Sequence, residues 1–308
     1  MNQPLLDHAT RTMAVGSKSF DTAAKLFDAD TRRSALMLYA WCRHCDDVID
    51  DQTLGFNIGT ASATNAQERL ASLEAQTRQA YAGEPMEAPA FAAFQEVALK
   101  HGIPPRRAFE HLEGFAMDVR DEHYTTFEDT LRYCYHVAGV VGLMMAQVMG
   151  VRDEKVLDRA CDLGLAFQLT NIARDIVEDA HAGRCYLPSN WLAEEALTMK
   201  TLNDPTCRPQ VARLAERLVS EAEPYYASAK GGLCGLTLRS AWAIATAHGV
   251  YRRIGLKVRR AGAHAWDKRQ STSKQEKLAL LIKGSALALS SRVTTPAPRP
   301  SGLWQRPA

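Results

Sequence analysis

Helical periodicity recurs along nearly the whole chain, and this pattern limits the possible folds more than any other feature. Apolar residues return every three or four positions, whereas no stretch alternates Val, Ile and Thr with polar residues between turn signals. We also find no internal repeat of fixed period. The sequence therefore predicts an all-α protein that folds as a single domain.

Cap residues and helix breakers divide the chain into its expected helices. Thr126 and Asp129 fit a capping box, and Gly183 is placed to end a long helix. The expected helices cover residues 5–15, 30 or 31 to 51, 66–82, 90–101, 104–121, 126–150, 153–181, 208–229, 236–262 and 273–289. We expect residues 1–290 to form the domain and the Pro-rich residues 291–308 to be a disordered tail.

Composition excludes several classes of protein. The net charge of +2 gives no general attraction to nucleic acid. The N-terminus lacks the basic start and apolar run of a secretory signal, and seven cysteines fit reduced thiols. The longest apolar stretch, 137–151, contains Gln147 and is shorter than the ~20 residues that span a bilayer. We therefore expect a cytoplasmic protein that meets the inner face of a membrane peripherally at most.

Two acidic segments stand out within this helical pattern. Asn171, Asp175 and Asp179 recur every fourth residue, so on a helix they form one ridge of oxygen ligands. Asp46 and Asp50 repeat the same spacing in an earlier helix. Like charges at this spacing destabilise a helix by a few tenths of a kcal/mol per pair. A cation is therefore expected opposite each ridge.

The acids allow two interpretations. Mg²⁺ prefers octahedral oxygen ligands and often bridges carboxylates to phosphate oxygens, so two facing ridges would suit a metal-bound diphosphate. Arg43 and Arg174 could take the remaining phosphate charge, because a guanidinium binds two oxygens at once. The other interpretation is a pair of solvated acidic surfaces. Spacing alone leaves both open.

Four segments carry a resemblance to a known family. They are GSKSF at 16–20, YAWCRHCDDVIDD at 39–51, YCYHVAGVVG at 133–142 and QLTNIARDIVEDAHAGRCYLP at 168–188. The chain resembles the squalene/phytoene synthase family from about residue 8 to about residue 285, and is most similar to its bacterial carotenoid-pathway members. The resemblance implies an isoprenoid-synthase-type helical bundle around a central apolar cavity.

The resemblance also implies a reaction and a set of residues. The reaction is the head-to-head condensation of two geranylgeranyl diphosphates, through prephytoene diphosphate, to phytoene, with two to three Mg²⁺ or Mn²⁺ ions and no nicotinamide cofactor. The implied metal ligands are Asp46, Asp50, Asn171, Asp175 and Asp179. The implied substrate contacts are Ser17, Ser19, Tyr39, Arg43, Gln168, Asn171, Arg174, Arg184, Tyr251 and Arg269. Tyr133 and Tyr186 match tyrosines near the reacting carbons, with Arg43 and Arg174 also counted as catalytic.

Other functions remain open on the sequence. The same fold could use farnesyl diphosphate to make squalene or dehydrosqualene, and cavity length, which decides this, is not readable from sequence. A terpene cyclase would place Ser and Glu in its second motif, where Asp179 stands here. A non-catalytic relative would have lost metal ligands, and none of the five is lost. A peripheral membrane contact for product release is also expected, and no nucleic acid partner.

Overall fold

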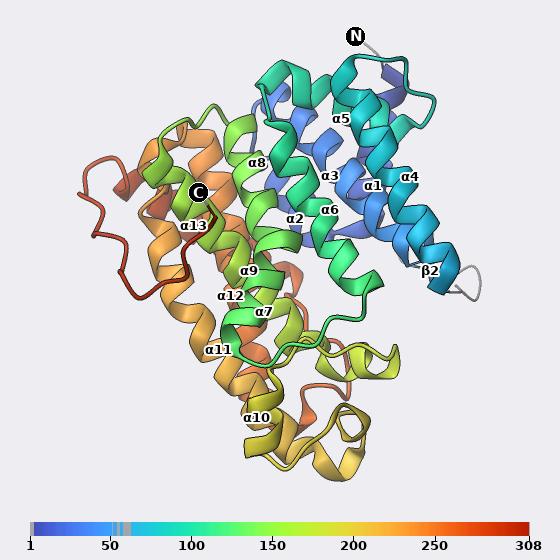
Figure 1. Ribbon diagram of the computed structural model, residues 1–308. Coiled ribbons are helices and arrows are strands. Elements are labelled where there is room, and N and C mark those ends of the chain that lie inside the picture. Colours follow the sequence, from blue (N-terminus) through green and yellow to red (C-terminus); the bar gives the residue numbers. More distant parts are fainter. Residues whose placement is uncertain (1–2, 51, 54–55, 58–62, 308) are drawn as a thin grey trace.

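In the computed structural model, residues 3–50, 52–53, 56–57 and 63–307 are described, and they form a bundle of helices (Figure 1). The first half contains α1 (Gln3–Gly16), α2 (Lys18–Ala24), α3 (Ala29–Ile49), α4 (Ala63–Ala82), α5 (Pro89–His101) and α6 (Pro105–Val119). The second half contains α7 (Phe127–Cys134), α8 (Val140–Val148), α9 (Glu154–His181), α10 (Ser189–Glu194), α11 (Arg208–Lys230), α12 (Leu238–Ala261) and α13 (Lys274–Ser290).

Short elements complete the chain. A two-residue antiparallel ladder joins β1 (Gln52–Thr53) to β2 (Phe56–Asn57) and is the sole sheet in the described ranges. The remaining elements are one π-helix, η1 (Tyr135–Gly139), and four 3₁₀ turns, η2 (Met199–Thr201), η3 (Pro205–Cys207), η4 (Leu233–Gly235) and η5 (Gly262–His264). The all-α class predicted from periodicity is confirmed.

Three details differ from the predicted helices. Asp28, not Asp30 or Thr31, caps α3, because its side chain accepts a hydrogen bond from the Thr31 backbone. The segment after Gly16 forms a separate helix, α2, which was not among the expected helices. The single helix expected over 126–150 is divided by η1, a π-helix of the kind that often marks functional sites.

Most of the apolar core of the described residues lies in two clusters, and a third, small cluster contains Ala24, Phe27, Ala35 and Ala243. One of the two large clusters gathers buried side chains of α1, α3, α4, α5 and α6, and the other gathers those of α7 to α13. Phe20 and Val141 pack against both clusters. The bundle therefore has two packed halves, joined along α8 and α2, and the cavity described below lies between them.

Helix α9 is the central element of the second half. Its 28 residues correspond to a length of roughly 42 Å. It packs against η1 closely enough that a Cβ atom on Gly164 would lie 2.3 Å from the Ala138 carbonyl oxygen. Likewise, a Cβ atom on Gly142 of α8 would lie 2.4 Å from the Ala160 carbonyl oxygen on α9. Only glycine at these positions allows the two backbones to approach so closely.

The C-terminal tail packs against the bundle. Arg299 donates to both carboxylate oxygens of Asp162 on α9, at 2.9 and 2.8 Å, and this aspartate is fully buried. Arg306 pairs with Asp158, one turn earlier, at 2.6 Å. The prediction that 291–308 is disordered is therefore wrong for the described part of the tail. The Pro-rich composition was a poor guide because the tail's arginines meet counter-charges on α9.

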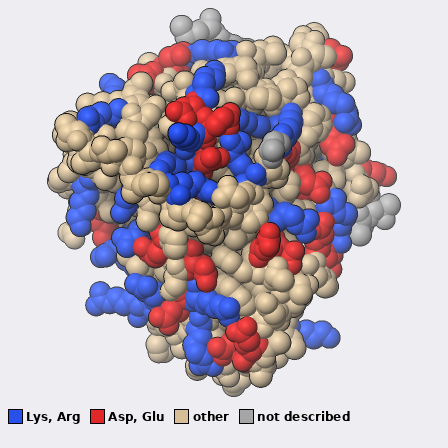
Figure 2. Space-filling view, turned by 60° about the vertical axis from the view of Figure 1, so that its left-hand side comes forward, with Lys and Arg blue, Asp and Glu red and all other residues tan. Residues whose placement is uncertain are grey.

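One face of the molecule (Figure 2) shows no strong excess of one charge, as the net charge of +2 leads one to expect. On the face shown in Figure 2, basic and acidic side chains are intermixed and no broad area carries one sign. Within the described ranges, every helix is too short or too polar to cross a bilayer. All seven cysteines are free thiols.

Candidate active site

One large cavity of about 1290 Å³ lies between the two halves of the bundle. A single face of α9 lines it along most of the helix, from Val156 through Gly164 and Gln168 to Asp175 and Asp179. These positions are spaced three, four, seven or eight residues apart, as one face of a helix requires. From Val156 to Asp175 the cavity follows α9 for roughly 28 Å.

The cavity is polar at one end and apolar at the other. On α9 the lining changes from Val156 and Leu163 to the acidic ridge. On α12 it changes from Ala243 and Ala247 to Tyr251 at the polar end. The cavity therefore has a long apolar interior and one acidic end. We call this end, formed by Asp46, Asp50, Asn171, Asp175 and Asp179, the acidic head.

The acidic head includes the C-terminal end of α3. The Asp46 carboxylate pairs with Arg43 at 2.9 Å, and Arg43 also pairs with Asp47 at 2.6 Å. Asp50 is the C-cap of α3 and forms an ion pair with Arg184, which follows α9. Each acid predicted on this helix is therefore matched by an arginine.

The second ridge lies along α9. Arg174 donates to both oxygens of Asp175, at 2.8 and 2.5 Å, and Arg269 reaches the same carboxylate at 3.1 Å. Arg269 also pairs with Glu178. Asp179 has no ion pair within the described ranges of the chain. The cationic partners expected from the sequence are therefore present at Asp175, whereas Asp179 has none in the described ranges.

Burial alters two of these carboxyl groups. It raises the pKa of Asp46 to about 6, against the opposing charge of Arg43. Burial and the neighbouring Asp175 raise the pKa of Asp179 to about 7, although Arg184 and Arg174 oppose this. A cation placed between the ridges would favour the charged form of both groups.

Asn171, Arg43 and His111 in the cavity wall each have a buried polar atom without a partner within the described part of the chain, and two of these atoms lie beside the acids. The amide nitrogen of Asn171 donates to Gln168 at 3.3 Å, which leaves its Oδ1 as a buried acceptor without a donor. On α3, Nε of Arg43 is a buried donor without an acceptor. The first atom suits a hard cation and the second suits an anionic oxygen, so the residues present fit a metal-bound diphosphate.

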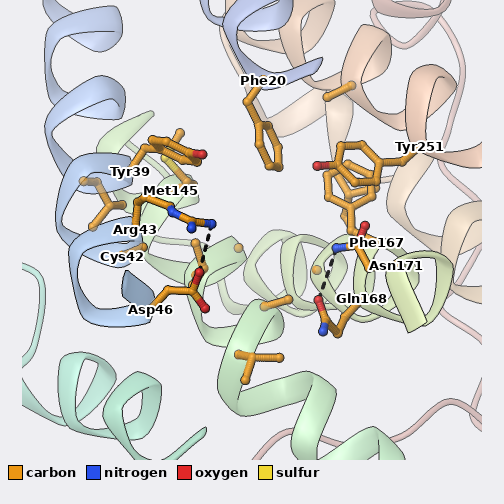
Figure 3. A pocket seen from close by; sticks show the side chains of 18 of the residues that line it. Phe20, Tyr39, Cys42, Arg43, Asp46, Met145, Phe167, Gln168, Asn171 and Tyr251 are labelled. Atoms are coloured by element: carbon orange, nitrogen blue, oxygen red, sulfur yellow. Dashed lines mark hydrogen bonds and ion pairs between the residues drawn. The ribbon is translucent and has the colours of Figure 1, made fainter. Parts of the chain in front are cut away.

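Aromatic and amide side chains flank the acidic head. Figure 3 shows Tyr39, Arg43 and Asp46 on one wall of the cavity, facing Gln168 and Asn171 on the other. Burial raises the pKa of Tyr39, so its hydroxyl is a neutral hydrogen-bonding group.

Tyr251 stacks on Phe167, with ring centroids 4.1 Å apart, and burial raises its pKa. Ser17 caps α2 by accepting from the Phe20 backbone, and its hydroxyl lowers the pKa of Tyr251 slightly. Ser17 therefore lies at the edge of the site, and the Ser19 side chain lies outside the described part of the chain.

Tyr133 and Tyr186 meet at a residue that the sequence analysis missed. Both hydroxyls donate to the carboxylate of Asp118 on α6, at 3.3 and 3.2 Å, and the two rings stack with centroids 4.5 Å apart. Asp118 stands between Met117 and Val119 near the end of α6, and sequence spacing did not single it out among the acids around it. All three side chains line the cavity.

The structure thus brings nearly all predicted site residues to one cavity. Those that line it are Tyr39, Arg43, Asp46, Asp50, Tyr133, Gln168, Asn171, Arg174, Asp175, Asp179, Arg184, Tyr186, Tyr251 and Arg269. Among the described ranges, no three His, Cys, Asp or Glu side chains are gathered closely enough to hold an ion alone.

Known proteins share this sequence and this fold. Residues 13–276 match the family described as squalene/phytoene synthase. The 15-cis-phytoene synthase of Pantoea ananas is 68% identical over 308 residues, covering all of both chains, and that of a Paracoccus species is 48% identical over 97% of each. A solved dehydrosqualene synthase superimposes with a TM-score of 0.82 at 27% identity, covering 94% of this chain and 98% of that one.

Proposed function

The chain belongs to the squalene/phytoene synthase family, and from that membership we propose that it is a phytoene synthase. It joins two geranylgeranyl diphosphates head to head, losing one diphosphate and one proton to give prephytoene diphosphate. A second loss of diphosphate and a proton gives phytoene. The observation that carries this proposal is the 68% identity, across the full length of both chains, to a 15-cis-phytoene synthase.

The acidic head binds the diphosphates in this proposal. Asp46 and Asp50 from α3, with Asn171, Asp175 and Asp179 from α9, would hold two to three Mg²⁺ or Mn²⁺ ions. Diphosphate oxygens and water complete the coordination, because Mg²⁺ keeps several waters and few protein ligands. When bound, the ions would neutralise the negative charge of the leaving diphosphate. The unpaired Oδ1 of Asn171 supports this assignment.

The arginines complete the binding of the anion. Arg43 and Arg174 line the cavity beside the carboxylates, and Arg184 and Arg269 approach from segments after α9. Because a guanidinium presents several donors in one plane, each can exchange a carboxylate oxygen for a phosphate oxygen. Tyr39, Gln168, Tyr251 and Ser17 would contribute neutral hydrogen bonds.

The apolar part of the cavity accommodates the prenyl chains. Small side chains on α8 and α12, such as Gly142 and Ala243, leave the space open, and Phe20 and Phe167 meet edge to face within it. Exclusion of water protects the allylic cations from being quenched. Tyr133 and Tyr186 lie between this interior and the acidic head, where cationic carbons form. No residue acts as a covalent nucleophile.

The rival substrate is farnesyl diphosphate, with squalene or dehydrosqualene as product. The 27%-identical dehydrosqualene synthase shares the fold, so the fold itself does not separate the two. A non-catalytic role is disfavoured because all five metal-ligand positions are retained and line the cavity.

A product assay separates these functions. Purified protein is incubated with Mg²⁺ and either geranylgeranyl or farnesyl diphosphate, and the hydrocarbon products are identified by mass. We expect a C40 hydrocarbon from the first substrate, and none when EDTA removes the metal. Products of C30 alone would assign the chain to the farnesyl-using members, and no product from either would indicate a non-catalytic protein.

We also propose that the protein works in the cytoplasm and meets the inner face of the membrane peripherally. Its substrate carries a long apolar chain and its product is a hydrocarbon, and both partition into lipid. The seven free thiols fit a reducing compartment. Flotation with liposomes, with and without product, would test the contact.

A further inference from the structure

Asp118 occupies the point where three segments of the chain meet in the cavity. It lies on α6, Tyr133 on α7, and Tyr186 after the end of α9. Its Oδ2 accepts from the Tyr133 hydroxyl at 3.3 Å and its Oδ1 accepts from the Tyr186 hydroxyl at 3.2 Å. One carboxylate thus holds two phenols, each through a different oxygen.

The protonation of the three groups fixes the direction of these hydrogen bonds. Burial raises the pKa of Tyr133 and of Tyr186 well above the usual value, so each phenol keeps its proton. Burial raises the pKa of Asp118 to about 7, and in its charged form it has no proton to donate. In that form both phenols donate to Asp118, their two hydroxyls also interact with each other, and their remaining lone pairs face away from the carboxylate. The rings are nearly parallel, with 16° between their planes, so the two oxygens lie side by side.

We propose that Asp118 is a positioning residue of this enzyme, which turns the lone pairs of both tyrosine oxygens toward the carbons that become cationic in the reaction. The inference deepens the proposed function and rests on it for the identity of those carbons. Asp118 acts through the phenols and does not itself touch substrate or metal. Oriented dipoles of this kind stabilise a transition state because they need no reorganisation as charge develops.

Replacement of the carboxylate by an amide shows why the charge state matters. An asparagine at this position accepts from one phenol through its oxygen and donates to the other through its nitrogen. The second phenol must then turn its own hydrogen elsewhere, toward the cavity. A partial positive charge would face the forming cation in place of a lone pair. Shape and volume hardly change, so the effect is electrostatic.

The kinetic test compares two variants of the same helix. Asp118→Asn should lower kcat on the order of 100-fold, as loss of an oriented electrostatic group does, and leave KM within about two-fold. Glu113→Gln is the control, because Glu113 is exposed and pairs only with Arg120 among the described residues. A folded Asp118→Asn enzyme with a kcat within two-fold of wild type would overturn the proposal.

A spectroscopic test needs no turnover. In protein labelled with [¹³Cζ]tyrosine, the resonances of Tyr133 and Tyr186 are assigned from the Tyr133→Phe and Tyr186→Phe variants. Both resonances should move in Asp118→Asn and stay in place in Glu113→Gln. If neither moves in Asp118→Asn, the shared hydrogen bonds do not exist in solution and the inference fails.

The two tests also separate this inference from the proposed function. If wild-type enzyme makes no C40 product, the proposed function fails whatever the spectra show.

If Asp118→Asn does not fold, Tyr186→Phe replaces it as the test, since this variant keeps the stacked ring but frees one carboxylate oxygen of Asp118. The Tyr133 resonance should then shift, and an unchanged resonance would show that the two phenols do not share Asp118.

Discussion

Arg184 pairs with Asp50 across 134 residues of sequence, and this contact joins the segment after α9 to the C-terminal end of α3. The same guanidinium opposes the raised pKa of Asp46, Asp118 and Asp179. A single arginine thus serves as counter-charge for acids of both ridges and of the tyrosine cluster. It holds the acidic head together when no metal is bound.

This relationship predicts how Arg184→Gln will respond to metal. The variant should melt several degrees below wild type in EDTA, because four acids lose a shared cation. Mg²⁺ with inorganic diphosphate should raise its melting temperature by more than it raises that of wild type, because Asp50 no longer has a competing partner. Scanning fluorimetry measures both shifts. Arg120→Gln, which loses only exposed ion pairs, is the control, and equal shifts in all three proteins would contradict the prediction.

Asp179 offers the cleanest test of the metal site. Asp175→Asn would leave Arg174 without its carboxylate, whereas Asp179 has no ion pair among the described residues, so Asp179→Asn removes a candidate ligand and little else. We expect kcat to fall on the order of 100-fold with helical content unchanged by circular dichroism. Glu154→Gln, at the exposed start of the same helix, should retain full activity. Near-normal turnover by Asp179→Asn would remove this residue from the metal site.

The buried carboxyls predict the pH dependence of stability without metal. Burial raises the pKa of Asp118 and of Asp179 to about 7, above the ~3.9 of an unfolded chain. The folded state therefore binds these protons more tightly, and stability falls as pH rises through the folded pKa. Histidines whose pKa burial lowers act in the opposite sense, among them His111 and His248, both lowered to about 4.

Histidines with lowered pKa values still lose protons in the unfolded chain just above pH 6.5, so they oppose the carboxyls over part of the range from pH 6.5 to 8. The carboxyl effect is therefore read from the difference between wild type and Asp179→Asn, in which the histidines are the same. The loss should be on the order of 1 kcal/mol for each of the two carboxyls. In EDTA, Asp179→Asn should gain in melting temperature relative to wild type as pH rises from 6.5 to 8. A difference between the two melting temperatures that stays constant or shrinks over this range would contradict the expectation.

The apolar end of the cavity predicts a change in chain-length preference. Ala243 is fully buried, lines the cavity and lies about two turns of α12 from Tyr251. Ala243→Leu would shorten the space for a prenyl tail without touching the acidic head. The ratio of kcat/KM for geranylgeranyl to farnesyl diphosphate should fall on the order of 10-fold. Because farnesyl diphosphate is the internal control, equal losses on both substrates would mean that this part of the cavity does not hold the tail.

The tail contact predicts a loss of stability without a loss of chemistry. Arg299→Gln leaves the buried Asp162 with only the Ser228 hydroxyl, at 2.6 Å, as a partner. Removing one member of a buried pair costs on the order of 3 kcal/mol, or roughly 5–10 °C in melting temperature. The kcat measured well below that temperature should match wild type. Arg292→Gln is a useful comparison, since this arginine donates only to backbone carbonyls among the described contacts.

Local spacing predicted a large part of the site. The four-residue interval of Asn171, Asp175 and Asp179 is a property of one helix, so sequence alone showed that they share a face. The family resemblance then added Tyr133, Tyr186 and Arg184. Asp118 was missed because its partners, Tyr133 and Tyr186, come from α7 and from the segment after α9, and local spacing does not reveal such a contact.

Long-range contacts explain the other differences. The α3 cap, the helix α2 and the π-helix η1 all involve a choice between neighbouring backbone hydrogen bonds, which packing decides. The close approach of η1 to α9 at Gly164 is such a packing constraint. The tail was misjudged for the same reason, because its arginines are satisfied by acids more than a hundred residues earlier.

The Arg299–Asp162 pair also bears on the order in which the chain matures. Asp162 lies in the helix around which the second half of the bundle is packed, yet its counter-charge comes 137 residues later in the chain. Chains emerge N-terminus first, at about 5–20 residues per second. A nascent chain therefore carries Asp162 without its arginine for several seconds, and the final packing of α9 waits until residue 299 has been made.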